Sequence, residues 1–183
     1  MALGSRKSPL AELEAFIRRE IPLSRSMGVT VSSLDGFALE LSAPLTPNLN
    51  HKKTAFGGSL YSLATLAAWG MVRQILIEAG MDAHVVIREG ALSYLKPVDG
   101  EFRARCERPS ENEAERFRQA LVRKGKARLA LRCEVRAATA SPDSAAAAVF
   151  QGVFAASRDP GRGSGSDRGS GSVRGNGTAR GKG

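Results

Sequence analysis

The feature that most constrains the fold is an apolar segment from Ser59 to Ala79, with Gly80 as the expected C-terminal cap. At helical spacing its apolar side chains cover most of the circumference: Leu60, Leu63, Ala64, Leu66, Ala67, Trp69, Met71, Val72, Ile75 and Leu76. A helix that is apolar nearly all round must be enclosed by other elements. The longest apolar stretch, residues 56–72, falls short of the roughly 20 residues that a membrane-spanning helix needs. The segment therefore predicts the buried core helix of a domain.

Two elements are expected before this helix. Residues 10–17 carry apolar side chains at helical spacing, with Ser8 as a possible N-cap and Pro22 beyond the end. Residues 29–42 show the period-two alternation of a half-buried hairpin that turns at Asp35-Gly36. The pattern thus predicts one amphipathic helix and two strands.

After the core helix, nearly everything is strand-like. Apolar runs predict strands at residues 85–87, 91–95, 102–106, 126–136 and 147–155. The clearest alternation lies in residues 126–136, where Leu129, Leu131 and Cys133 face inward and charged residues face outward. Residues 111–124 are expected to form a short charged helix or a loop.

The order of the elements indicates the fold class. One helix, two strands, a long buried helix and four or five strands do not alternate as in a parallel doubly wound sheet. We therefore expect an α+β domain in which an antiparallel sheet wraps around one long central helix. Such a sheet leaves an outer edge poorly covered, so we expect copies to pair as a homodimer or a dimer of dimers.

The 183 residues have room for one domain and a tail. We place the domain at residues 1–157 and a disordered Gly/Ser/Arg-rich tail at residues 158–183, which is too poor in apolar side chains to fold. Six basic residues and two aspartates in the tail contribute +4 of the net charge of +9, so the body carries +5. This moderate excess suits the phosphates of a small ligand, an acidic partner or solubility alone, and we expect neither nucleic acid nor membrane as a partner.

Other sequence features bear on the location of the protein, the state of its cysteines and its need for cofactors. Residues 1–9 lack the apolar stretch of an export signal, so we expect a cytoplasmic protein. Cys106 and Cys133 fall on inward strand faces and are expected to be reduced core thiols. Neither a phosphate loop, a dinucleotide fingerprint nor metal-ligand spacing occurs, and we expect no cofactor and no metal.

The strongest functional signal is a polar loop, residues 47–56, that leads into Gly57 and Gly58 at the start of the buried helix. Backbone N–H groups at a helix N-terminus lack intrahelical partners, and the helix dipole adds partial positive charge. A thioester carbonyl placed there would gain hydrogen bonds as its oxygen becomes negative. The alternative is that the two glycines ease a tight turn or helix packing.

Three polar residues accompany the glycines. Thr65 lies seven residues after Gly58 and so projects from the same side of the helix, unless its hydroxyl bonds back to the preceding turn. Asn50 can hold a water or a carbonyl. His51 can transfer a proton near neutral pH, or it has a surface or structural role.

At this point the sequence resembles the hot-dog thioesterase superfamily, most closely the thioesterase family that also occurs as the C-terminal domain of YiiD-type acetyltransferases. The resemblance spans roughly residues 10–156. It is carried by Ile21-Pro22-Leu23-Ser24, Met27-Gly28-Val29, Asn48-Leu49-Asn50-His51, Phe56-Gly57-Gly58-Ser59-Leu60, Leu63-Ala64-Thr65-Leu66-Ala67, Trp69 and Tyr94-Leu95-Lys96-Pro97. Together these segments are quite specific to the family.

The resemblance implies a hot-dog fold, dimers with sites at the subunit interface, and a thioester carbonyl held around Gly57 and Gly58. In related acyl-CoA thioesterases a histidine precedes the glycine pair, and an acidic residue on the helix acts as base or nucleophile. Phe56 and Thr65 stand at those positions here, and neither can do that job.

The sequence therefore favours hydrolysis of an acyl thioester carried on coenzyme A or an acyl carrier, with Asn50 and Thr65 positioning the water. Basic residues near the sheet edge are candidates to meet the carrier's phosphates: Lys96, Arg103, Arg105 and Lys126. A non-catalytic acyl-CoA or acyl-carrier binding module is the alternative, because the acidic residue on the helix is missing. A third interpretation is RNA contact through the basic tail.

Overall fold

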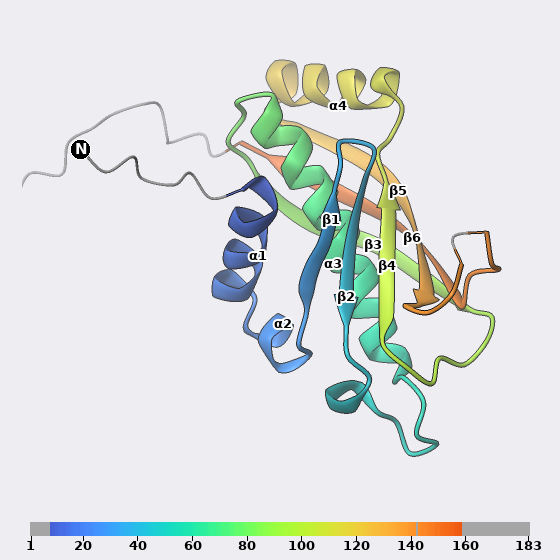
Figure 1. Cartoon of the computed structure of the whole chain (residues 1–183). Helices are drawn as coiled ribbons and strands as arrows, with labels where there is room; N and C mark the ends of the chain where they lie inside the picture. Colours follow the sequence, from blue (N-terminus) through green and yellow to red (C-terminus); the bar gives the residue numbers. More distant parts are fainter. Residues whose placement is uncertain (1–7, 142, 159–183) are drawn as a thin grey trace, which may run out of the picture.

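The predicted core segment forms helix α3 (Gly57–Glu78), which begins two residues earlier than expected. The computed structural model describes residues 8–141 and 143–158, and the predicted tail from residue 159 onward lies outside them (Figure 1). The other elements are α1 (Pro9–Glu20), α2 (Pro22–Ser26), β1 (Thr30–Leu34), β2 (Ala38–Ala43), the short 3-10 helix η1 (Thr46–Asn48), β3 (His84–Tyr94), β4 (Phe102–Glu107), α4 (Glu111–Lys124), β5 (Lys126–Ala137) and β6 (Ala148–Ser157).

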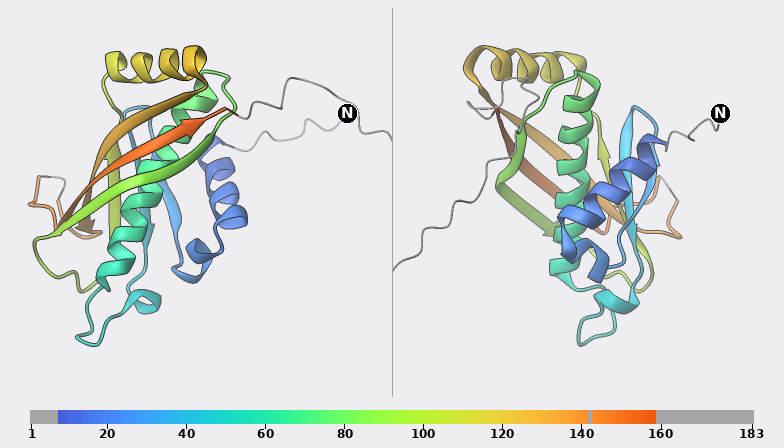
Figure 2. Two further views of the ribbon diagram at one scale, coloured as in Figure 1. Left: turned by 180° about the vertical axis from the view of Figure 1, so that it is seen from behind. Right: turned by 90° about the vertical axis from the view of Figure 1, so that its left-hand side faces the viewer.

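Six strands form one antiparallel sheet in the order β1-β2-β4-β5-β6-β3. Figure 2 shows this sheet curving around α3, with α1 beside β1 and α4 across one end. The expected α+β architecture, an antiparallel sheet wrapped around one long central helix, is therefore confirmed. By length and composition alone α3 resembles a membrane-spanning helix, but 61% of its apolar window is buried inside the domain.

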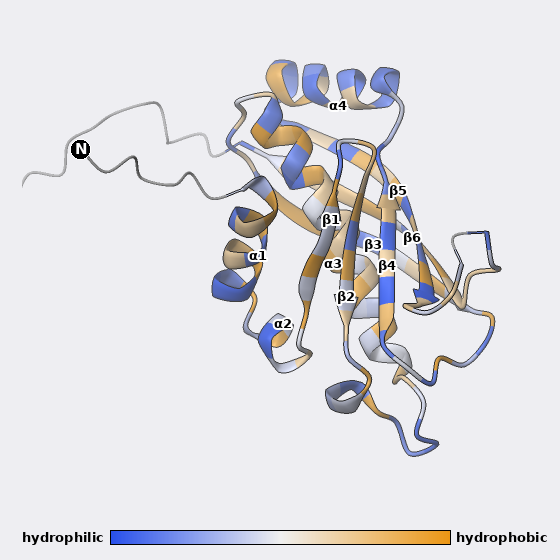
Figure 3. Cartoon of the chain, viewed as in Figure 1, coloured by the Kyte–Doolittle hydropathy of each residue, from blue (hydrophilic) through white to orange (hydrophobic). Residues whose placement is uncertain are grey.

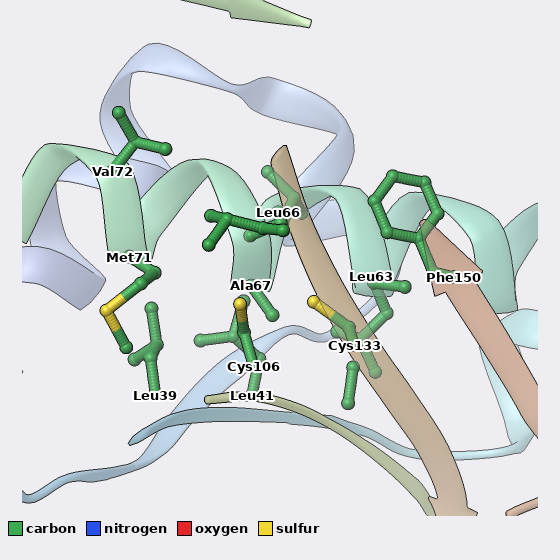
Figure 4. Close-up of a cluster of buried hydrophobic side chains, with 14 of the residues drawn as sticks. Leu39, Leu41, Leu63, Leu66, Ala67, Met71, Val72, Cys106, Cys133 and Phe150 are labelled. Atoms are coloured by element: carbon green, nitrogen blue, oxygen red, sulfur yellow. The ribbon is translucent and has the colours of Figure 1, made fainter. Parts of the chain in front are cut away.

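The core forms where α3 meets the inner face of the sheet, with side chains from β2, β4, β5 and β6 converging on the helix (Figure 4). Buried residues of β5 alternate with exposed or half-buried residues, most of them charged, as its sequence pattern predicts (Figure 3). Cys106 stands opposite Cys133 across β4 and β5, and both are buried free thiols. Burial, reinforced by the neighbouring Cys106, raises the pKa of the Cys133 thiol well above its ordinary value. The Cys133 thiol is therefore protonated, and both cysteines are parts of the core.

The structure corrects the prediction of separate strands at residues 85–87 and 91–95, because both belong to the continuous strand β3. The residues between them are charged or glycine and look like a turn, but the strand accommodates them in a bulge after Ile87. Gly90 is needed there because a Cβ would collide with the hydroxyl of Tyr61. β3 pairs with β6 alone, so its outer edge has no neighbouring strand within the described chain.

Two local predictions are resolved at the ends of the sheet. The hairpin turns as expected, with Asp35 accepting hydrogen bonds from the N–H groups of Phe37 and Ala38, which lower the pKa of its carboxyl group. The segment predicted as a charged helix or a loop is the helix α4. Its apolar side packs on β5, and Gly125, with φ of 65°, ends it.

Candidate active site

Helix α3 begins without a side-chain cap. Its N-cap residue is Phe56, which has no hydrogen-bonding side chain. The N–H groups of Gly57 and Gly58 have no acceptor among the residues that the structure describes. We call this pair of N–H groups the helix mouth. Two unpaired donors thus coincide with the positive end of a 22-residue helix, an arrangement that stabilises an oxygen carrying or developing negative charge.

Close packing explains why both residues of the helix mouth are glycines. Tyr94 of β3 donates its hydroxyl to the Gly57 carbonyl at 3.1 Å, and a Cβ on Gly57 would lie 3.0 Å from the Tyr94 ring. A Cβ on Gly58 would overlap the ring of Phe56. The close packing that the alternative interpretation expects is therefore present, and the two N–H groups have no acceptor in the described part of the chain.

A hollow of about 300 Å³ opens beside the helix mouth. Its walls come from α2 and the following turn, from the loop before α3 and from the first turns of α3: Leu23, Ser26, Met27, Pro47, Asn48, Phe56, Gly58, Ser59 and Ser62. Leu23 and Phe56 are both 56% exposed. Neither a carboxylate nor an imidazole belongs to this lining. The hollow therefore offers apolar walls, hydroxyl groups and one end of a helix.

Asn50 organises the loop that precedes α3. Its Nδ2 donates to Thr54 Oγ1 at 2.9 Å and to the Ala55 carbonyl at 3.3 Å. Its Oδ1 accepts from the N–H groups of Lys52 at 2.8 Å and Thr54 at 3.2 Å. Both ends of the amide are engaged within the loop, and Asn50 is not part of the hollow's lining. A direct contact with water or substrate stays a prediction.

The structure does not bring the other two predicted polar residues into the lining of the hollow. His51 is exposed in the turn after Asn50. Thr65 lies on α3 beyond Ser62, with its Oγ1 buried and without a hydrogen-bond partner among the described residues. The alternative that this hydroxyl bonds back to the preceding turn is therefore wrong. Leaving a buried hydroxyl unpaired costs about 1–3 kcal/mol, so Thr65 retains an unused polar group inside the domain.

The sequence matches the model of a known protein family. The family described as "Putative thioesterase (yiiD_Cterm)" matches residues 10–158. The chain belongs to this thioesterase family. Its six-stranded antiparallel sheet around a long central helix is the hot-dog fold.

Solved structures agree with this assignment. A protein of unknown function from Chlorobaculum tepidum is 38% identical, with 81% of this chain and 94% of that chain covered and a TM-score of 0.78. A "putative thioesterase" from Shewanella oneidensis is 28% identical, with 81% and 97% covered and a TM-score of 0.71. A thioesterase from Haemophilus influenzae, 13% identical with 85% and 94% covered and a TM-score of 0.60, shares the fold.

In this member of the thioesterase family, sequence reasoning assigned no role to two residues of the site. Asn48 lines the hollow and is 2% exposed. Tyr94 contacts Gly57 from 37 positions along the chain. Both lie within segments that resemble the family, but only the folded chain shows what each side chain touches. A contact between α3 and the end of β3 leaves no local spacing signal in the sequence.

The basic residues predicted to meet the carrier's phosphates do not gather at the helix mouth. Arg103 and Arg105 line a separate hollow of about 650 Å³ on the face of the sheet away from α3, where Arg103 lies 3.8 Å from Glu40. Lys96 and Lys126 are exposed. Their contact with phosphates stays a prediction. Within residues 8–141 and 143–158, no three His, Cys, Asp or Glu side chains gather as a metal site.

Proposed function

We propose that this chain hydrolyses acyl thioesters carried on coenzyme A or on an acyl-carrier protein. The single observation that carries the proposal is the helix mouth, where the Gly57 and Gly58 N–H groups, at the positive end of α3, have no acceptor among the described residues. Membership of a thioesterase family supports the same reaction class. In the reaction, water adds to the thioester carbonyl carbon and the C–S bond breaks. One proton of the water stays with the acid, and the other ends on the leaving sulfur.

We assign the following roles to the candidate residues. The thioester oxygen accepts hydrogen bonds from the helix mouth, and one such donor typically contributes about 10²–10³ in rate. Asn50 fixes the loop that carries Phe56. Thr65, whose buried hydroxyl has no partner among the described residues, positions the attacking water from within α3. His51, exposed beside Asn50, exchanges protons with solvent.

We also propose that the working unit is a homodimer or a dimer of dimers joined along β3. Among the described residues no strand pairs with the outer edge of β3, and the exposed apolar side chains Val86, Ile87, Tyr94 and Leu95 lie on this strand or just beyond it. An eleven-residue edge strand with exposed apolar side chains favours pairing with another strand. A lysine on such an edge opposes pairing.

Val86→Lys should therefore give a monomer in size-exclusion chromatography with light scattering. Val122→Lys is the matched control, because Val122 is as exposed as Val86 but lies on α4. A Val86→Lys protein that keeps the mass of the wild type would show that β3 is not the interface.

Thiol release from short, medium and long acyl-CoA thioesters tests the proposed reaction. Gly58→Ala places a methyl group where the Phe56 ring lies, so the ring must shift across the helix mouth. Because displacements near 1 Å at a reacting group are costly, we expect turnover to fall by on the order of 10- to 100-fold. Gly100→Ala is the control, since nothing lies within 4 Å of that position. Equal turnover in both variants would contradict the proposed location of the reaction.

A non-catalytic acyl-thioester binding module is the second candidate. One observation favours it: Thr65 stands where related enzymes carry an acidic residue, and no carboxylate lines the hollow. Titration calorimetry with acyl-CoA separates the two functions. Binding that Gly58→Ala weakens, without thiol release by the wild type, would support the binding module.

A further inference from the structure

The hollow beside the helix mouth has no charged group in its walls. Among the described residues, the nine that line it include neither an acidic nor a basic side chain. The hollow on the outer face of the sheet differs in this respect, because five arginines and four glutamates line it. An ionised group that leaves water for an uncharged site loses hydration and gains no ion partner. The hollow at the helix mouth therefore favours an uncharged ligand.

The walls of this hollow also present apolar surface that the domain leaves exposed. Leu23 from α2 and Phe56 at the start of α3 both line the hollow, and each residue is more than half exposed. Met27 and Pro47 add further apolar atoms to the same walls. A hydrocarbon chain that covers this surface removes it from water, which is favourable. The uncharged ligand is therefore expected to carry an apolar chain.

The hollow is continuous with the proposed reaction centre, because Gly58 belongs both to its lining and to the helix mouth. A thioester carbonyl carbon bears two substituents, the acyl chain and the sulfur of the carrier arm. The arm contains amide groups and ends in phosphate, whereas a saturated acyl chain is hydrocarbon. Uncharged walls with exposed apolar side chains match the acyl chain better than the arm.

We propose that this hollow receives the acyl chain, that it selects uncharged acyl groups, and that the gain from chain length ends at about ten carbons. The inference rests on the proposed function and names its substrate class. The hollow has a volume of about 300 Å³. A methylene group takes up about 30 Å³, close to the share of one water molecule in the liquid. Each methylene that the hollow covers should raise kcat/KM about two- to fourfold, and further carbons extend into solvent and add little.

Thiol release by the full-length protein tests both limits, with acyl-CoA thioesters as the probes. From acetyl-CoA to decanoyl-CoA, kcat/KM should rise with each added methylene, and lauroyl-CoA and palmitoyl-CoA should give no further rise. Butyryl-CoA and succinyl-CoA form a matched pair, because their acyl groups have equal numbers of carbons and only the succinyl group ends in a carboxylate. We expect kcat/KM for succinyl-CoA to be about 10- to 100-fold lower, since its carboxylate meets no cation in the lining. A flat series over chain length, or equal values for the matched pair, would overturn the inference and leave the proposed function intact.

Ser26→Arg places a cation at the rim of the hollow, because Ser26 lines it and is exposed at the end of α2. The ratio of kcat/KM for succinyl-CoA to that for butyryl-CoA should rise about three- to fivefold, as expected for a partly exposed ion pair. Ser157→Arg is the matched control, since Ser157 is also exposed but lies at the end of β6 and outside the lining. An unchanged ratio in Ser26→Arg, or the same rise in Ser157→Arg, would show that the acyl chain does not lie in this hollow.

Ser62→Leu narrows the hollow from the side of α3. It should lower kcat/KM about tenfold more for octanoyl-CoA than for acetyl-CoA, because the longer chain competes with the new side chain for space. The carrier arm is the same in every substrate, so an equal loss for all acyl-CoAs would place the arm in the hollow and overturn the inference. Each ratio compares two substrates on one preparation and so does not depend on the folded fraction. A wild type that releases no thiol from any acyl-CoA would overturn the proposed function, and this inference with it.

Discussion

The N-termini of α4 and α3 are built in opposite ways. At α4, the Ser110 hydroxyl accepts from the Glu113 N–H and the Glu113 carboxylate accepts from the Ser110 N–H. Both backbone N–H groups are therefore hydrogen-bonded within the chain. At α3, Phe56 cannot do this, and the helix mouth stays open. The capping box of α4 thus pairs its orphan N–H groups with the helix's own side chains. The open end of α3 forgoes that stabilisation and keeps two donors available for a ligand.

Giving α3 the cap that it lacks should produce the largest effect. In Phe56→Asp, the carboxylate would accept from the N–H groups of the first turn and occupy the place proposed for the thioester oxygen. Turnover should fall by about 10²–10³, as for loss of an oxyanion donor. The free energy of unfolding should change by no more than about 1 kcal/mol, because the new cap offsets the lost packing of the Phe56 ring.

Kinetics and chemical denaturation on the same preparation would measure both quantities. Phe56→Leu is the control, since it leaves the helix end uncapped and apolar. Full turnover in Phe56→Asp would show that the open N–H groups are not used in the reaction.

Removing the cap from α4 should have the reverse effect, lowering stability while leaving turnover nearly unchanged. Ser110→Ala breaks the capping box, so the free energy of unfolding should fall by about 1 kcal/mol and the Tm by about 2–4 °C. Turnover should stay within about twofold of the wild type, because α4 lies across the other end of the domain (Figure 2). Differential scanning calorimetry with Ser110→Thr as the retained-cap control measures the loss. An unchanged Tm would mean that α4 does not depend on this cap.

The smallest effect concerns the pH dependence of the same cap. Hydrogen bonds from the Ser110 side chain and N–H hold the pKa of Glu113 below its ordinary value of 4.5. A carboxyl group with a lowered pKa in the folded state contributes stability above the unfolded pKa and loses it as the pH falls through the folded value. The Tm difference between wild type and Glu113→Gln should be present near pH 7 and shrink below about pH 4. A difference that is the same at both pH values would assign the cap to hydrogen bonding without charge.

Much of the fold could be predicted because its signals are local. The all-round apolar pattern identified α3, the alternation in β5 identified an inward and an outward face, and the turn at Asp35-Gly36 closed the hairpin as expected. The continuity of β3 was missed, because Gly90 reads as a turn residue until Tyr61 is seen to occupy the place of its side chain.

The candidate site was predicted in part. Gly57 and Gly58 stand out because two glycines at a helix start are a local signal, and the structure leaves their N–H groups open. Asn50 stands out equally in the sequence, yet its amide is used within its own loop. Asn48, only two positions away, has the buried unpaired oxygen. The loop has to fold before the two asparagines can be told apart.

The sequence by itself determined the buried helix, the antiparallel strands around it and the glycine pair at the helix start, because periodicity and backbone freedom belong to neighbouring residues in the chain. Only the tertiary structure decided what surrounds that helix start: the Tyr94 ring against Gly57, the Asn48 side chain beside the hollow and, among the described residues, the outer edge of β3 without a neighbouring strand. These features depend on contacts between distant segments, whose distances and hydrogen-bond partners exist only after the sheet has closed around α3.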